Sequence, residues 1–300
     1  MSRASSKEPY AITRRGRQQL QDLGDDEIRA RLRRDGFVLL RGFGANEQEF
    51  AAFVRRFAGR FVPDLRPERP PYGGIQGLHN VDLGYADLLM HFELGSLPVQ
   101  PQLIAFLCLN PAEQGGETLI ADGARVWEQL SADEQATLRA LRVTALSRVP
   151  RTTWVRWLDP PELGEEEADI ERFRAMLPSV PDFSHTFEKA YRGQLVAVLR
   201  CTKPTVIERP WLPGRPIVGV ALATNHTGVA VVCADDSPIP RSLIRSVGRA
   251  IGEVCVPVRW EAGDLAVVDN IRCMHGRTQF SDTRRKVLSL MADLLPEQQL

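Results

Sequence analysis

The amino-acid sequence predicts a mainly β fold with flanking helices, built as a double-stranded β-helix, or jelly roll. Apolar segments of strand length recur along the chain, turn residues bound many of them, and few segments carry apolar side chains at helical spacing. Many short strands with few helices are typical of an antiparallel sandwich or barrel of the double-sheet kind. A chain of 300 residues, 43% hydrophobic, suffices for one large core, so we expect a single domain over residues 21–300.

The N-terminal region is expected to begin with a disordered leader. Residues 1–20 are polar, arginine-rich and without periodicity. Acidic residues precede arginines in residues 25–32, which suits a short helix and its dipole, and Gly36 ends this helix. Residues 37–42 then form a compact apolar strand, and Asn46 is expected to cap the next helix.

The next elements are strands and a capped helix. The apolar runs at residues 103–109 and 118–121 predict two buried strands. Ser131 and Glu134 predict a capping box at the start of a helix that extends to residue 141. This part of the chain shows no glycine-rich phosphate loop after a strand.

The stretch from residue 145 to 215 is the least patterned part of the chain. It is rich in tryptophan, proline and arginine and contains an acidic helix candidate at residues 165–176. Insertions between core strands often carry substrate-specific loops, so we expect a lid here. The strands expected around and after it are residues 195–199, 217–222, 229–232, 265–268 and 286–291, with a helix at residues 240–254.

Composition excludes several classes of partner. Lysine plus arginine equals aspartate plus glutamate at 38 each, so we expect a small-molecule substrate and no bulk attraction to nucleic acid or to an anionic membrane. The five cysteines form no C-x-x-C pair, which predicts free thiols in a reducing cytoplasm. No segment approaches the roughly 20 apolar residues of a membrane span. The composition leaves the oligomeric state open.

Three residues carry the strongest chemical signal: His91, Glu93 and His275. They would supply two imidazoles and one carboxylate, the facial set that holds ferrous iron and leaves the opposite positions open. The His-x-Glu spacing alone is weak evidence, because two-residue spacing on a strand merely places both side chains on one face. Its weight comes from the motifs that surround it.

Several motifs lie around these three residues along the chain. They are His91-Phe92-Glu93, Gly115-Gly116-Glu117-Thr118, the run from Gly263 to Asn270, His275-Gly276-Arg277-Thr278 and Arg284-Arg285. With them, the chain resembles the iron(II)/2-oxoglutarate dioxygenases of the taurine dioxygenase and clavaminate synthase superfamily from about residue 36 to residue 292. The glutamate ligand is more similar to the clavaminate synthase and amino-acid hydroxylase branch, whereas the Gly-Gly-Glu-Thr turn is more similar to the taurine enzymes.

The resemblance implies a clavaminate synthase-like jelly roll. It assigns the two histidines and the glutamate to Fe(II), with 2-oxoglutarate and O2 at the open positions. It also implies that Arg285 and the hydroxyl of Thr118 bind the distal carboxylate of 2-oxoglutarate, because a planar guanidinium can bind a carboxylate through two hydrogen bonds. Arg284 is the second candidate, since adjacent residues of a strand point to opposite faces and only one of the two can serve.

The substrate is less well defined by the resemblance. In the taurine enzymes a second arginine, four residues after the first, binds the sulfonate, and here that position is Ser289. The substrate must therefore be held elsewhere. Candidates within the insertion are Arg148, Arg151, Arg156 and Arg192. The resemblance implies an amino acid or amino-acid-derived metabolite of a specialised pathway, free or tethered to a carrier protein.

The implied reaction is hydroxylation of an unactivated C–H bond with release of succinate and carbon dioxide. Desaturation or cyclisation would use the same residues, so the sequence leaves both open. A non-catalytic jelly-roll binding or regulatory protein is a second class, against which the complete triad argues. A cupin-like metal enzyme is a third class, but cupin ligands usually lie closer together in sequence than His91 and His275 do.

Overall fold

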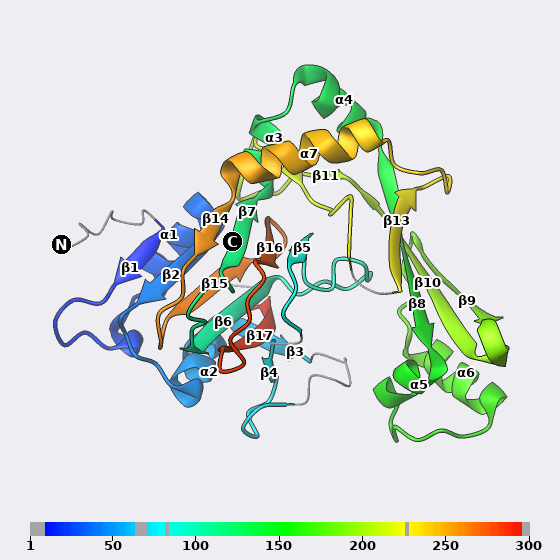
Figure 1. The fold of residues 1–300 in the computed structure, drawn as a ribbon, viewed down its shortest axis with the longest axis horizontal. Helices are drawn as coiled ribbons and strands as arrows, with labels where there is room; N and C mark the ends of the chain where they lie inside the picture. Colours follow the sequence, from blue (N-terminus) through cyan, green and yellow to red (C-terminus); the bar gives the residue numbers. More distant parts are fainter. Residues whose placement is uncertain (1–9, 64–70, 82–83, 226–227, 296–300) are drawn as a thin grey trace.

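Two β-sheets that pack face to face form the main body of the molecule, and a third sheet extends to one side (Figure 1). The computed structural model describes residues 10–63, 71–81, 84–225 and 228–295. The strands of the main body are mainly antiparallel, and its sheets are open at their edges. The prediction of a mainly β, double-sheet jelly roll with flanking helices is confirmed.

The large sheet supplies one half of the main body. Its seven strands are β1 (Ala11–Thr13), β2 (Phe37–Arg41), β3 (Ala58–Val62), β4 (Leu78–Asn80), β6 (Leu103–Asn110), β15 (Leu265–Asp269) and β17 (Lys286–Leu294). Their order is β1-β2-β15-β6-β17-β3, with β4 beside β17. The helical elements packed on it are η1 (Leu20–Asp22), α1 (Asp25–Asp35) and α2 (Glu47–Arg55). Val38, Phe50 and Leu288 belong to the apolar cluster that joins these helices to the outer face of the sheet.

The small sheet faces the large one across the core. Its strands, in spatial order, are β14 (Val256–Val258), β7 (Thr118–Asp122), β16 (Cys273–Arg277) and β5 (Leu88–His91). Phe106, Ile120 and Val287 are buried in the core between the two sheets. The elements on the outer side of the small sheet are α3 (Gly123–Glu128), α4 (Ala132–Ala140), α7 (Arg241–Val254), β11 (Val206–Ile207) and β12 (Ile217–Val218).

The helix boundaries follow the predicted caps. Asn46 and Ser131 each accept a hydrogen bond from the backbone N–H of a glutamate three residues on, and each glutamate accepts one from the cap residue in return. The helix α1 ends at Gly36, whose φ of +78° lies in the left-handed region that favours glycine.

The strand expected at residues 217–222 ends instead at Val218, because its partner β11 is only two residues long.

The region expected to be a poorly patterned insertion is largely regular structure. We call its sheet the side sheet; it comprises β8 (Arg142–Pro150), β9 (Phe183–Lys189), β10 (Leu195–Pro204) and β13 (Val229–Cys233), in the order β13-β8-β10-β9. The helical elements at its far end are α5 (Arg151–Trp154), η2 (Val155–Trp157), α6 (Glu166–Met176) and η3 (Tyr191–Gly193). Trp154, Phe173 and Ala197 are fully buried in a separate apolar cluster there, which explains the tryptophan and phenylalanine content of the segment.

The structure differs from the expected disordered leader at residues 11–13. These residues form β1, which pairs in parallel with β2 at the edge of the large sheet. The backbone hydrogen bonds of an edge strand and the burial of Ile12 in the outer cluster order a segment whose arginine-rich neighbours obscure it in the sequence. Residues 1–9 lie outside the described residues.

A buried ion pair links the two sheets to α1. Arg272 is fully buried, and its Nε and Nη2 donate to the two carboxylate oxygens of Asp122 at 2.9 and 2.5 Å. Its Nη1 also donates to the carbonyl oxygen of Arg33 at 2.7 Å, near the C-terminus of α1. Arg272 therefore satisfies a helix end and fixes the chain just before β16.

Two other sequence predictions concern cysteines and membranes. All five cysteines are free, and all except Cys255 are buried, as the sequence predicted. Within the described part of the chain, no helix has the length and apolar character needed to cross a bilayer.

Candidate metal centre

The pairing of β5 with β16 brings together two histidines that are distant in sequence. His91 and His275 are direct partners across this antiparallel pair, so their side chains lie on the same face of the small sheet. The centroids of their rings are 4.4 Å apart, and the ring planes meet at 50°. The register shifts between His275 and Arg277, which marks a bulge beside the pair.

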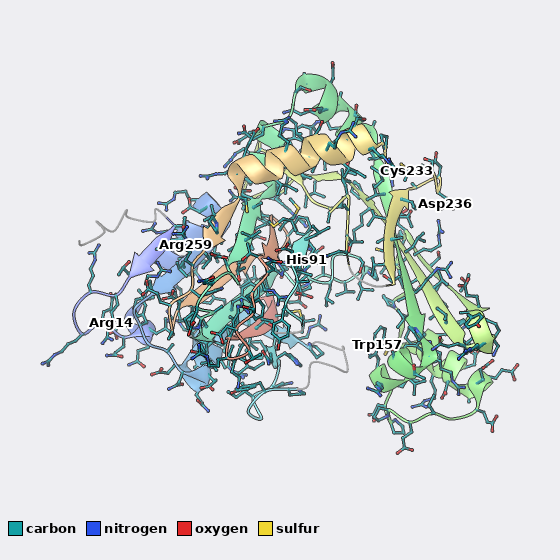
Figure 2. All side chains as sticks on the ribbon, in the orientation of Figure 1. Arg14, His91, Trp157, Cys233, Asp236 and Arg259 are labelled. Atoms are coloured by element: carbon teal, nitrogen blue, oxygen red, sulfur yellow. The ribbon has the colours of Figure 1, made fainter. Side chains whose placement is uncertain are left out.

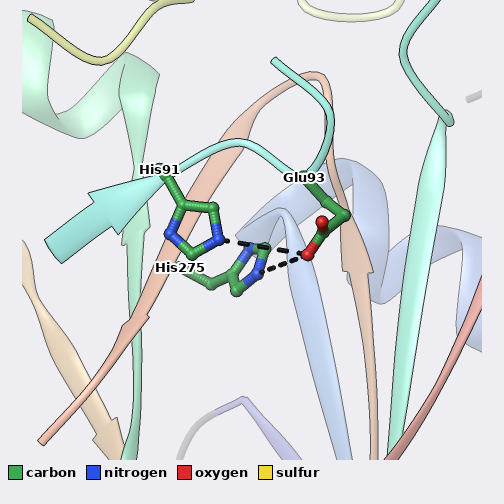
Figure 3. A group of neighbouring side chains, drawn as sticks. All are labelled: His91, Glu93 and His275. Carbon is green, nitrogen blue, oxygen red and sulfur yellow. Dashed lines mark ion pairs between the residues drawn. The ribbon is translucent and has the colours of Figure 1, made fainter. Parts of the chain in front are cut away.

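Glu93 completes the group from the loop that follows β5. Its Oε2 atom lies 3.9 Å from Nε2 of His91 and 3.6 Å from Nε2 of His275 (Figure 3). All three candidate ligand atoms lie within 4.8 Å of one another, and all three side chains are at least partly buried. A single ion can bridge atoms at these separations. The structure thus brings together the three candidate ligands that the sequence indicated.

The hydrogen bonds of the imidazoles fit metal ligation. Nδ1 of His91 lies 2.8 Å from the carbonyl oxygen of Leu89, and a carbonyl can only accept, so Nδ1 carries the proton and Nε2 keeps its lone pair. Nε2 is the atom that faces Glu93. His275 is buried against Phe106, with ring centroids 5.4 Å apart. Two neutral imidazoles and one carboxylate form the donor set of non-haem ferrous oxygenases.

Asn270 fixes the backbone of Glu93. Its Oδ1 accepts a hydrogen bond from the Glu93 N–H at 2.9 Å, and its Nδ2 donates to the Glu93 carbonyl at 3.0 Å and to the Pro101 carbonyl at 2.8 Å. Asn270 is fully buried, so these bonds are shielded from water. The sequence motif contained this residue, but its role becomes visible only when the turn after β15 meets the loop after β5.

Arg285 and Arg284 occupy opposite environments. Arg285 is 4% exposed, and its Nε and Nη2 donate to the carbonyl oxygen of Gly116 at 3.2 and 2.9 Å. Arg284 points outward and forms ion pairs with Asp282 and Glu113. The interior position of Arg285 suits the binding of an anion inside the jelly roll, whereas Arg284 is engaged at the surface.

Thr118 lies on the same face of the small sheet as the histidines. It pairs with Arg277 on β16, two residues from His275, and is 5% exposed. Its hydroxyl accepts a hydrogen bond from Nε1 of Trp260 at 3.0 Å. The same oxygen can donate its own proton to a carboxylate. Thr118 is therefore a buried donor in the core that also contains Phe106 and Trp260.

A cavity of about 710 Å³ opens from the metal centre toward the side sheet. His91 and Glu93 line it on one side, and Ala145, Leu199 and Val229 of the side sheet line it on the other. Figure 2 labels His91 on the main body and Trp157, another lining residue, beside the side sheet. Its volume lies within the ~300–1,000 Å³ of small-molecule sites.

Two of the four arginines predicted to bind substrate lie on or next to β8. Arg148 borders the cavity, but the residues of β8 that face it are Ala145, Ser147 and Val149, so alternation directs the Arg148 side chain to the opposite face. There its guanidinium forms an ion pair with Glu188. Arg151 forms a 2.5 Å ion pair with a fully buried aspartate, Asp169. Both guanidinium groups are thus engaged within the region of the side sheet.

The other two predicted arginines are remote from the cavity. Arg156 is exposed and is not among the residues that line it. Arg192 is exposed in η3, with its guanidinium 5.3 Å from the ring centroid of Tyr191. None of the four arginines directs its guanidinium into the cavity. The cation that does line it from the side sheet, Lys203, was missed because a lysine at the end of a strand is typical of a solvated position.

The sequence as a whole matches one family. Residues 11–291 match the family described as taurine catabolism dioxygenase TauD, TfdA family. The chain belongs to this family. As a TauD/TfdA member it is a 2-oxoglutarate-dependent dioxygenase that uses Fe(II), which confirms the predicted enzyme class, cofactors and superfamily. Membership in this family supports an enzyme and not a non-catalytic binding protein.

Two curated relatives are similar in sequence. The dapdiamide synthesis protein DdaC of Enterobacter agglomerans is 23% identical over 287 residues, which cover 90% of this chain and 85% of DdaC. A clavaminate synthase-like protein of Arabidopsis thaliana is 36% identical over 66 residues, but this match spans only 22% of this chain and 20% of the relative.

Solved structures show the same fold at low sequence identity. A taurine dioxygenase from Burkholderia xenovorans has a TM-score of 0.61 and 18% identity, covering 96% of this chain and 89% of that one. PvcB from Pseudomonas aeruginosa has a TM-score of 0.57 and 14% identity, covering 94% of this chain and 84% of that one. PvcB is described as an Fe, alpha-ketoglutarate dependent oxygenase from an isonitrile synthetic pathway.

Proposed function

We propose that this TauD/TfdA protein hydroxylates an unactivated C–H bond of an amino acid or amino-acid-derived metabolite, free or bound to a carrier protein. In this proposal His91, Glu93 and His275 hold the ferrous ion, and Arg285 with Thr118 binds 2-oxoglutarate. The observation that carries it is the meeting of the three ligand side chains within 4.8 Å beside a substrate-sized cavity. The names of DdaC and PvcB, which refer to dapdiamide synthesis and an isonitrile pathway, support a specialised metabolite as the substrate.

The reaction balances without a further reductant. With iron and 2-oxoglutarate bound, R–H, O2 and 2-oxoglutarate give R–OH, succinate and carbon dioxide. The carbonyl of Leu89 favours the neutral tautomer of His91 in which Nδ1 carries the proton and Nε2 the lone pair, and Asn270 holds the backbone of Glu93. Arg285 acts in a buried setting, where its attraction for a carboxylate is stronger than in water. The apolar cavity walls exclude water from the target carbon.

An anaerobic titration tests the metal and co-substrate assignments. We expect 2-oxoglutarate added to the Fe(II)-loaded protein to produce a weak visible charge-transfer band, and iron-dependent succinate to form once oxygen is admitted. His91→Ala and His275→Ala should abolish both signals, because each removes a ligand. Full activity in either variant would contradict the assignment of His91 and His275 as iron ligands.

A matched control separates loss of the site from loss of the fold. His185 lies on β9 of the side sheet, among Phe183 and Phe187, and away from the metal centre. His185→Ala should keep the band and the succinate. Incubation with a panel of amino acids, their acylated derivatives and carrier-bound forms, followed by mass spectrometry, would then identify a product 16 mass units heavier than its substrate. A product lighter by two hydrogens would instead indicate desaturation or cyclisation.

A further inference from the structure

The cavity beside the candidate metal centre contains a lysine, Lys203. Lys203 lies on β10, and its Nζ donates a 2.9 Å hydrogen bond to the carbonyl oxygen of Gly95. Among the described residues no carboxylate forms an ion pair with it. Gly95 is two residues from Glu93, so the ammonium group lies against the loop that carries the candidate metal ligand. Burial lowers the pKa of Lys203, which means that the protein leaves part of the desolvation of this cation uncompensated.

A second polar group faces the same cavity without a partner. Ser147 is 6% exposed and lines the cavity, and its hydroxyl has no hydrogen-bond partner among the described residues. Ser147 pairs with Leu199 on β10, and Lys203 lies four residues further along β10, so both point from the same face of the side sheet. Buried hydroxyls are almost always hydrogen-bonded, so an unpartnered one in a substrate cavity indicates a ligand atom.

Two other described cations line the cavity, but neither reaches it from the cavity-facing side of the side sheet, because Arg277 lies on β16 of the small sheet. The Nη2 of Arg277 donates to the carbonyl oxygens of Gly84 and Ala86, each at 3.0 Å. Arg148 points from the opposite face of β8 and pairs with Glu188. Lys203 therefore remains as the cation that can meet a substrate from the side sheet.

The charge of the cavity selects the class of ligand. Among the described lining residues Glu93 is the one carboxylate, and it is a proposed metal ligand. No other described lining carboxylate could pair with the α-ammonium of a free amino acid. Most of the remaining wall is apolar, with Val143, Val220 and Val231 among its residues. The cavity therefore suits a largely apolar molecule with one anionic group and a blocked amine.

We propose that Lys203 and Ser147 form the substrate-anchoring site of this enzyme, and that the substrate is a carboxylate whose amine is acylated or otherwise uncharged. The inference rests on the proposed function, because it takes the cavity beside the iron ligands as the substrate site. The ammonium binds the carboxylate, and the Ser147 hydroxyl donates a hydrogen bond to a second polar group of the substrate, the acyl oxygen, further along the same face of the side sheet. The apolar part of the molecule then lies along the side sheet.

A pair of matched ligand series tests this site. The probes are N-acylglycines with acyl chains of six to twelve carbons and the corresponding N-acylglycinamides, which differ only in charge at one end. Binding is measured by calorimetry on the anaerobic protein saturated with Fe(II) and 2-oxoglutarate. We expect the carboxylates to bind about 10- to 100-fold more tightly than the amides, as for a hydrogen bond to a charged group.

Variants at the proposed anchor should remove this preference. Lys203→Met and Lys203→Gln should bring the two series to equal affinity, whereas Lys203→Arg should keep part of the difference. Lys203→Gln preserves a donor to Gly95, so it serves if the Met variant does not fold. Ser147→Ala should weaken the binding of both series by a similar factor, because both carry the acyl oxygen that this hydroxyl would contact. Lys189→Met, on β9, is the control, because Lys189 pairs with Glu166 outside the cavity.

Three outcomes would overturn the anchoring site: no probe binds, both series bind the wild type equally, or the preference survives in Lys203→Met and Lys203→Gln. The titrations are repeated on wild-type protein without iron and 2-oxoglutarate. A carboxylate preference there, combined with failure to form the charge-transfer band or succinate, would refute the proposed function and leave the anion site standing. The band and succinate without any carboxylate preference would refute the anchoring site alone.

Discussion

The side chain of Asn270 holds the backbone of Glu93 by both its N–H and its carbonyl, at 2.9 and 3.0 Å. This contact joins the turn after β15 to the loop after β5, so it links the strand that leads to His275 with the loop that carries the carboxylate. These two hydrogen bonds fix the backbone of Glu93 and thereby the position of its Cα atom, from which the side chain extends. Metal ligands depend on such supporting contacts for their orientation.

Replacement of Asn270 by alanine should weaken metal binding more than it changes the fold. We expect Asn270→Ala to reduce Fe(II) affinity by roughly 10- to 100-fold, the range found for residues that orient metal ligands. The measurement is an anaerobic metal titration, with circular dichroism as a check on folding. Asn110→Ala is the control, since Asn110 Nδ2 donates to the Arg284 carbonyl at 2.6 Å on an exposed part of the molecule. Equal affinity in the wild type and Asn270→Ala would show that Glu93 needs no such support.

The two adjacent arginines should differ sharply in their effect on 2-oxoglutarate binding. Arg285→Leu removes a buried guanidinium, and two lost charge-assisted hydrogen bonds correspond to a loss of affinity of roughly 100-fold or more. Arg284→Leu removes surface ion pairs with Asp282 and Glu113, which contribute about 0–1 kcal/mol to stability. The affinity for 2-oxoglutarate should therefore change by less than about fivefold. Titration of the charge-transfer band gives both constants. A large loss of affinity in Arg284→Leu and a small one in Arg285→Leu would assign 2-oxoglutarate binding to Arg284.

The sequence predicted the long strands of the large sheet but missed the short strands that carry the two histidines of the candidate metal centre. β6, β15 and β17 have long apolar runs, and their positions follow from pattern alone. β5 and β16 have four and five residues, and each ends at or contains a histidine, so they lack a strand pattern. The motif order located His91 and His275, but only the pairing of these strands places the two rings side by side.

The substrate side of the cavity could not be read from the sequence for a physical reason. Ser147 and Lys203 reach the same face of the side sheet through the pairing of β8 with β10, across a segment that contains two α-helices, two 3-10 helices and β9. Nothing local in the sequence distinguishes Lys203 from a solvated lysine, or Arg148 from an arginine that faces the substrate. The strand alternation that separates them depends on the register.

The close approach of Gly116 to Arg285 explains why the turn at Gly115-Gly116 requires a glycine. The φ of Gly116 is +71°, and a Cβ at this position would lie 2.7 Å from Nε and 2.9 Å from Cδ of Arg285. We therefore expect Gly116→Ala to displace the guanidinium and to raise the dissociation constant of 2-oxoglutarate by about tenfold or more, in addition to a backbone cost of roughly 1–3 kcal/mol. Gly214→Ala is a close control, because Gly214 has a φ of +73° and open space around its Cα. Both variants should lose thermal stability, but only Gly116→Ala should lose affinity; equal 2-oxoglutarate affinity in the two would contradict the steric account.

Asp269 should make the stability of the fold depend on pH. Burial raises its pKa to about 6, against an ordinary value near 4, although it accepts hydrogen bonds from the backbone N–H groups of Ile271 and Arg272. Between these pH values the folded protein binds more protons at this site than the unfolded chain does. The contribution of Asp269 to the free energy of unfolding therefore falls as pH rises from about 4 to 6 and stays low above that.

Asp269→Asn removes this titration and keeps an oxygen that can accept the two backbone hydrogen bonds. Relative to the wild type, the variant should gain up to about 3 kcal/mol in free energy of unfolding between pH 4 and pH 7, the amount that corresponds to the shift in pKa. Urea unfolding at several pH values measures this difference directly. A difference that stays constant with pH would mean that the charged carboxylate of Asp269 is fully compensated by its neighbours and that burial there carries no net cost.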